Sequence, residues 1–143
     1  MAGILLVTHN GLGDSLVDCV RHVLGQVPPD LLVLTVKAND DPARKEAEGR
    51  TLIEYMDNGE GVLLLADMFG ATPCNIGRRL CEQPNVRGIA GVNLPMLLRA
   101  VYNRDKPLAE LAQMALDGGR DCIVAMDSDQ PEERCNAATG RTD

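Results

Sequence analysis

Aromatic side chains and clustered cations are what this sequence has least of. Its 143 residues include no Trp, one Phe and two Tyr, so base-stacking platforms and aromatic cages lack their material. Acids outnumber bases by 21 to 14, a net charge of −7, which argues against a nucleic-acid partner. No apolar run reaches the roughly 18 residues of a membrane span. The first residues also lack the basic segment and cleavage site of a signal peptide.

Cysteine is present but shows no metal or disulfide pattern. The five cysteines are odd in number and widely spread, and none forms a C-x-x-C pair. They are Cys19, Cys74, Cys81, Cys122 and Cys135. This spacing predicts neither a zinc site nor a disulfide framework and fits a reducing cytoplasm. The dinucleotide fingerprint and the P-loop motif are also absent, so we expect no metal and no cofactor.

Short apolar runs alternate with amphipathic stretches along the chain. The runs are nearly continuous, as in parallel strands that are buried on both faces. Predicted strands are Ile4–Val7, Leu31–Val36, Val62–Ala66, Val86–Val92 and Cys122–Met126. Predicted helices are Leu16–Leu24, Pro42–Asp57, Cys74–Cys81 after the start signal Thr72-Pro73, Leu94–Val101 and Leu108–Leu116, with Gly25 and Gly118-Gly119 as stops. This order predicts an α/β domain with a doubly wound parallel sheet over residues 1–127. The polar stretch 128–143 is expected to be a mobile tail.

Ligands of open parallel sheets bind beyond the carboxyl ends of the strands, where the strand order reverses. His9 follows the first apolar run, and Asp67 follows the third. A carboxylate that accepts a hydrogen bond from one ring nitrogen leaves the other as a nucleophile. The helix start at Thr72-Pro73 offers N–H groups to an anion. The combination predicts that His9 takes up a phosphoryl group without a bound metal.

Each of these residues has a structural interpretation when taken alone. Taken alone, His9 is equally consistent with a turn residue that makes a local hydrogen bond, and Asp67 is better explained as a helix or turn cap. Their coincidence at one end of the sheet favours a site. Cys74 near a helix start could be a thiolate with His9 as its base, although a buried packing role is favoured. A receiver-like switch phosphorylated on Asp67 ranks low. The acidic pair after the first strand and the late lysine that such a switch needs are missing.

Three segments carry a resemblance to a known family. They are residues 4–9 (ILLVTH), 61–75 (GVLLLADMFGATPCN) and 89–97 (IAGVNLPML). In these segments the chain resembles the IIA component of the mannose-type sugar phosphotransferase system, in matching order over roughly residues 1–126. A related phosphotransferase subunit of dihydroxyacetone kinase systems remains the alternative.

The resemblance implies a flavodoxin-like doubly wound sheet of strand order 2-1-3-4. It also implies a late antiparallel strand, Cys122–Met126, exchanged in a homodimer. The implied function is a phosphohistidine carrier that takes phosphate from phospho-HPr and passes it to a separate IIB protein, or acts in regulation. The implied location is cytoplasmic, with at most peripheral contact with a membrane permease complex.

The resemblance also assigns roles to residues. His9 would carry the phosphoryl group, and Asp67 would orient its ring. The residues expected to bind phosphate are Thr8, Gly70, Ala71 and Thr72. The residues expected to border the site are Phe69, Asn93, Pro95 and Met96. Many relatives place a glycine directly after the histidine, where this chain has Asn10.

Overall fold

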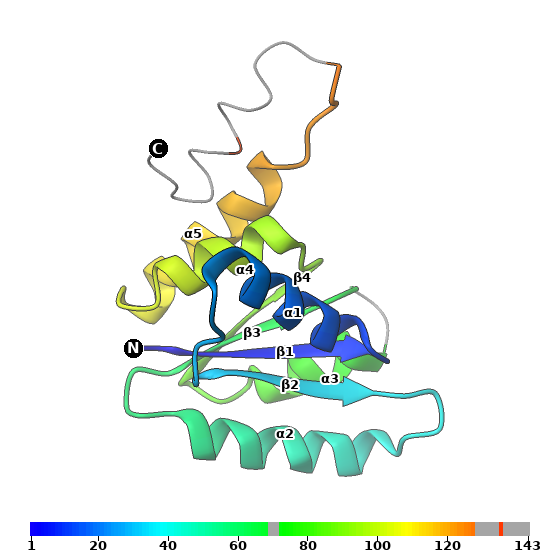
Figure 1. Ribbon diagram of the computed structural model, residues 1–143. Coiled ribbons are helices and arrows are strands. Elements are labelled where there is room, and N and C mark those ends of the chain that lie inside the picture. The colour runs from blue at the N-terminus through cyan, green and yellow to red at the C-terminus, as the bar shows by residue number, and fades with distance from the viewer. Residues whose placement is uncertain (69–71, 128–134, 136–143) are drawn as a thin grey trace.

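A four-stranded parallel sheet forms the centre of the computed structural model, which describes residues 1–68, 72–127 and 135 (Figure 1). The strands are β1 (Gly3–His9), β2 (Leu31–Val36), β3 (Val62–Ala66) and β4 (Val86–Ala90). Their spatial order is β2-β1-β3-β4, and all neighbours are parallel, as predicted. The order reverses between β1 and β3, so the switch point lies beyond their carboxyl ends.

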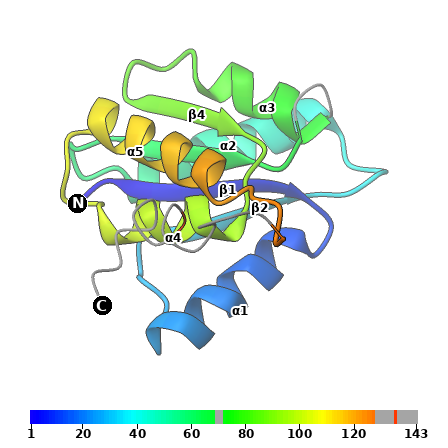
Figure 2. The ribbon, with the colours of Figure 1, turned by 90° about the horizontal axis from the view of Figure 1, so that it is seen from above.

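Helices cover both faces of this sheet (Figures 1 and 2). The helices are α1 (Leu12–Leu24), α2 (Pro42–Met56), α3 (Thr72–Leu80), α4 (Leu94–Tyr102) and α5 (Leu108–Asp121). One apolar cluster packs α1, α4 and α5 against one face, and a second packs α2 and α3 against the other. None of the helices in the described part of the chain is long and apolar enough to cross a membrane.

The alternation of side chains explains why the central strands are continuously apolar. In β1, Ile4 and Leu6 enter the first cluster, while Leu5 and Val7 enter the second. All four are 0% exposed. A strand with helices on both faces has no solvent side, so every position must be apolar. This arrangement fixes the backbone that carries His9.

Several boundaries differ from the sequence prediction; α1, for example, begins at Leu12 rather than Leu16, and two of the differences lie at glycines. The glycine pair at 118–119 was expected to end the last helix, but α5 continues through it to Asp121. A Cβ at Gly119 would lie 2.7 Å from Cε of Met96, so the glycine lets α5 pack closely on α4. Tertiary packing thus overrides the low helix propensity of glycine here. Strand β4 ends at Ala90 rather than Val92, because Gly91 turns the chain with φ +89°.

Residues 122–126, expected to be a late antiparallel strand, form no strand in this single chain. A strand of that kind needs a free sheet edge beside it, and pairing with a partner chain stays a prediction.

The expectation of no disulfide is wrong, because Cys122 is bonded to Cys135. The 13-residue separation is short enough for the chain to return on itself. The rest of the expected tail, 128–134 and 136–143, lies outside the described residues.

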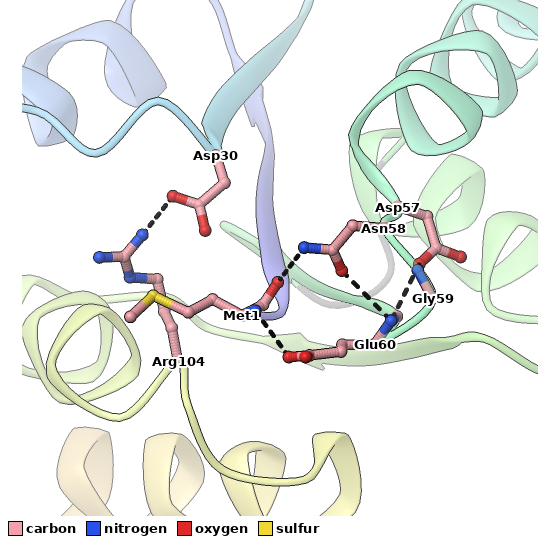
Figure 3. A network of polar contacts seen from close by, with 8 residues as sticks. Met1, Asp30, Asp57, Asn58, Gly59, Glu60 and Arg104 are labelled. Carbon is pink, nitrogen blue, oxygen red and sulfur yellow. Dashed lines mark hydrogen bonds and ion pairs between the residues drawn. The ribbon is translucent and has the colours of Figure 1, made fainter.

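Polar contacts join the loops at the amino ends of the strands, opposite the switch point (Figure 3). Asp57, which follows α2, accepts hydrogen bonds from the N–H groups of Gly59 and Gly61 and, at 2.6 Å, from Nδ2 of Asn85. These bonds lower the pKa of the Asp57 carboxyl, the Asn85 bond most strongly. A separate ion pair joins Arg104 to Asp30.

Candidate functional site

His9 and Asp67 meet at the carboxyl edge of the sheet, as the sequence predicted. His9 is the last residue of β1, and Asp67 directly follows β3. Oδ2 of Asp67 lies 2.8 Å from Nδ1 of His9 and also accepts a hydrogen bond from the His9 main-chain N–H at 2.9 Å. The carboxylate thereby takes the place of the main-chain acceptor that a longer β3 would offer. The side chain of Asp67 is 8% exposed and that of His9 is 46% exposed.

This geometry determines which ring nitrogen of His9 has a free lone pair. A carboxylate can only accept hydrogen bonds, so Nδ1 carries the proton that lies between the two side chains. The neutral ring then has its lone pair on Nε2. Because almost half of the side chain is exposed, an incoming electrophile can approach the ring. The pair can therefore present a nucleophilic nitrogen and balance the positive charge that builds up on the ring.

The loop after His9 depends on an unusual backbone conformation. Asn10 has φ +46°, and among the described residues it alone combines a positive φ with a side chain. Asparagine tolerates the left-handed region better than other residues with a Cβ. Asn10 is therefore suited to this turn, and α1 begins two residues later with Gly11 as its N-cap. The resemblance pointed to this position, but sequence alone did not reveal its conformation.

The predicted phosphate-binding segment is only partly described. Thr72 is the first residue of α3 and is exposed. It borders a groove of about 440 Å³ between α2 and α3, together with Asn75 and Arg79. Gly70 and Ala71, also expected to bind phosphate, lie outside the described residues, as does Phe69.

Thr8 does not occupy the position expected of a phosphate ligand. Its side chain is buried with 0% exposure, on the face covered by α1. A Cβ placed on Gly13 would lie 2.5 Å from Thr8 Oγ1, which shows how closely α1 covers this hydroxyl. Side chains alternate along β1, so Thr8 and His9 point away from each other. The expected contact between Thr8 and phosphate is therefore not supported by this geometry.

Three of the four expected border residues, Asn93, Pro95 and Met96, follow β4, the strand beside β3. Asn93 caps α4 by accepting the N–H of Met96 at 2.9 Å, and its Nδ2 donates to the carbonyl of Gly119 at 3.0 Å. Met96 is 3% exposed, and Pro95 lies in the first turn of α4. The contacts of Asn93 and Met96 are thus with α4 and α5, and their place at the border of the site stays a prediction.

Cys74 is the third residue of α3. It is 4% exposed and belongs to the apolar cluster between α2, α3 and the sheet. Its proposed base, His9, already directs Nδ1 at Asp67. Both observations favour a packing role for this thiol. Among residues 1–68, 72–127 and 135, no three His, Cys, Asp or Glu side chains converge as a metal site needs.

Two exposed apolar side chains that adjoin the loops of the pair in sequence were not singled out from the sequence. Leu12, the first residue of α1, is 45% exposed, and Met68, which follows Asp67, is 59% exposed. Each is adjacent in the chain to the loops that hold His9 and Asp67. Their positions just after predicted strands were the only signal in the sequence, because single exposed apolar residues are common and carry no pattern.

Comparison with known proteins places the chain in a family. The family model described as the PTS system fructose IIA component, EIIA-man, matches residues 3–115. The mannose-specific EIIAB component of Escherichia coli K12 is 28% identical over 138 residues, which cover 94% of this chain. The chain spans 42% of the length of that relative.

Solved structures show the same fold. The phosphotransferase component EIIA from Streptococcus agalactiae superposes with a TM-score of 0.79 at 21% identity, covering 87% of this chain and 97% of its own. The mannose/sorbose-specific IIA subunit from Enterococcus faecalis gives 0.79 at 23% identity, covering 90% and 97%. At identities this low, the similarity shows that the backbones share one fold.

Proposed function

The chain belongs to the mannose-type IIA family of the sugar phosphotransferase system, and on that premise we propose that His9 carries a phosphoryl group between two partner proteins. The observation that carries the proposal is the 2.8 Å contact between Nδ1 of His9 and Oδ2 of Asp67. It leaves Nε2 as the nucleophile on an exposed ring.

The transfer is a displacement at phosphorus. The lone pair of His9 Nε2 forms the new P–N bond while the P–N bond of the donor phosphohistidine breaks, and its electron pair returns to the donor ring. The positive charge that develops on the His9 ring is balanced by Asp67 through Nδ1–H. The N–H groups at the start of α3 and the Thr72 hydroxyl are suited to the phosphoryl oxygens.

The test uses phospho-HPr as the donor. We expect one phosphoryl group per chain, labile in acid and stable in base, as judged by intact mass. His9→Ala abolishes the uptake, whereas His22→Ala, which removes the other histidine of the chain, leaves it unchanged. Uptake by the His9→Ala variant would overturn the proposal.

The exposed apolar pair Leu12 and Met68 supports a docking surface for the donor. In sequence they adjoin the loops that hold His9 and Asp67, and exposed apolar side chains beside a reactive group commonly mark contact sites. Met68→Ser is expected to raise the KM for phospho-HPr more than it lowers kcat. Tyr55→Ser is the matched control, because Tyr55 is 83% exposed near the far end of α2.

The remaining partners are proposed on the same premise. The acceptor is a separate IIB protein, the location is cytoplasmic, and any contact with a membrane permease complex is peripheral. A homodimer is supported by two features: β4 is an edge strand, and Ile123 and Met126 are 72% and 95% exposed. Light scattering tests it, since Ile123→Lys should yield monomers if this segment pairs with a partner sheet.

A further inference from the structure

Two side-chain oxygens at the reactive edge of the sheet are buried without a hydrogen-bond partner among the described residues. They are Oγ1 of Thr8 and Oδ1 of Asp67. Thr8 is 0% exposed, and the side chain of Asp67 is 8% exposed. Buried polar atoms in folded proteins are nearly always hydrogen-bonded, so each such atom calls for an explanation.

The two atoms belong to neighbouring positions of the sheet. Val7 pairs with Ala66 at the end of the β1–β3 ladder, so Thr8 and Asp67 are the next residues on each side. Thr8 alternates in phase with Leu6, which lies in the cluster beneath α1, α4 and α5, while Asp67 lies one residue beyond the end of β3. Both unpartnered oxygens therefore belong to residues that directly follow one paired position of the β1–β3 ladder.

Their chemistry is complementary. A threonine hydroxyl always has a proton to donate, whereas a carboxylate can only accept. The close approach of α1 at Gly13 shuts the hydroxyl away from solvent, so its partner must come from the protein interior. Oδ2 of Asp67 is already occupied by His9, and Oδ1 is the atom that still needs a donor.

We propose that Thr8 is a positioning residue for the His9–Asp67 pair. Its hydroxyl turns about the Cα–Cβ bond into the neighbouring rotamer and donates to Oδ1 of Asp67. This bond holds the carboxylate in the orientation that directs Oδ2 at Nδ1 of His9, and so keeps the proton on Nδ1 and the lone pair on Nε2. Its effect on phosphoryl transfer rests on the proposed function, whereas its effect on the ring tautomer does not.

The first measurement is the tautomer of His9, read from the ¹⁵N shifts of its ring at about pH 8, where imidazole is ordinarily uncharged. In Thr8→Val and Thr8→Ala, which both lack the hydroxyl, we expect the Nδ1–H form to lose population to the Nε2–H form. Thr8→Ser keeps the hydroxyl and should restore the wild-type shifts. Thr35→Val is the matched control, because Thr35 pairs with Thr8 on the other neighbouring strand.

The second measurement is the rate of phosphoryl uptake from phospho-HPr. Loss of a hydrogen bond to a charged group is expected to slow it about tenfold in the two hydroxyl-free variants, with little change in KM. Thr8→Ser and Thr35→Val should remain near the wild-type rate.

Two results would overturn the proposal. One is a wild-type tautomer ratio in both Thr8→Val and Thr8→Ala. The other is a change in Thr8→Ser as large as that in Thr8→Val, which would show that packing rather than the hydroxyl matters. If the wild-type protein takes up no phosphate while the tautomer responds as expected, the proposed function fails and the positioning role of Thr8 stands.

Discussion

Asp67 accepts two hydrogen bonds from His9 on a single oxygen, Oδ2: one from the main-chain N–H and one from ring Nδ1. The first bond anchors the carboxylate to the end of β1, and the second transmits that position to the ring. The His9 imidazole is thus aligned with the end of β1. Sites built on strands are held more precisely than sites built on loops.

Asp67→Asn should keep the fold and slow phosphoryl transfer. The amide oxygen can still accept from His9, but it no longer offers a full negative charge to the ring as the phosphoryl group arrives. We expect the rate to fall by about 10²-fold, the usual scale for losing a preorganised electrostatic partner. Quenched-flow measurement of the rate of phosphoryl uptake checks this prediction. Asp105→Asn is the control, because Asp105 is an exposed aspartate away from His9 and Asp67. An unchanged rate would remove Asp67 from the mechanism.

Substitutions at Asn10 and Gly11 should separate backbone strain from side-chain size. Asn10→Ala places an ordinary residue at φ +46° and should cost about 1 kcal/mol of stability, while Asn10→Gly should cost nothing. Gly11→Ala is the neighbouring control: Gly11 has φ −87°, and a Cβ there meets nothing within 4 Å. Urea unfolding gives the three values. Equal losses for Asn10→Ala and Gly11→Ala would contradict the assignment of strain to Asn10.

Asp57 should make stability depend on acid pH. Hydrogen bonds from Asn85, Gly59 and Gly61 lower the pKa of its carboxyl in the folded state. The stabilisation is therefore complete above the unfolded-state pKa, near 3.9, and is lost as the pH falls through the lower folded-state value. Asp57→Asn should be less stable than wild type at neutral pH, with the gap narrowing below about pH 4. A gap that is independent of pH in urea titrations would refute this.

Thiol counting checks the disulfide. Protein handled without reductant should show three reactive thiols after denaturation, namely Cys19, Cys74 and Cys81. After reduction all five cysteines should react. In Cys122→Ser the partner Cys135 becomes free, so all four remaining cysteines should react without reduction. Five thiols in the unreduced wild-type protein would show that the bond does not form.

Much of the fold could be read from the sequence because its strands are buried on both faces. The runs at 31–36 and 62–66 match β2 and β3 without adjustment, since a continuous apolar segment between polar ends leaves one place for a strand. The failures lie where tertiary contacts decide. Gly119 was expected to stop a helix, and its fit against Met96 instead lets α5 continue.

The sequence predicted that His9 and Asp67 lie together, but it did not predict the burial of the neighbouring Thr8 hydroxyl. Topology alone brings the ends of β1 and β3 together, which is why His9 and Asp67 could be paired. The side of the sheet on which Thr8 lies follows from alternation along β1, but the burial of its hydroxyl depends on how closely α1 approaches at Gly13. That distance is a property of the packed helix and has no counterpart in a local motif.

The different environments of the five cysteines make the native protein suited to labelling at a single site. Cys19 is exposed on α1, Cys74 is buried, and Cys122 and Cys135 are bonded to each other. Burial, and after it the proximity of Cys74, raises the pKa of the Cys81 thiol, so little reactive thiolate forms there near neutral pH. A maleimide dye should therefore select Cys19, on the helix that starts three residues after His9. Such a fluorophore would report the arrival of a docking protein without any engineered cysteine.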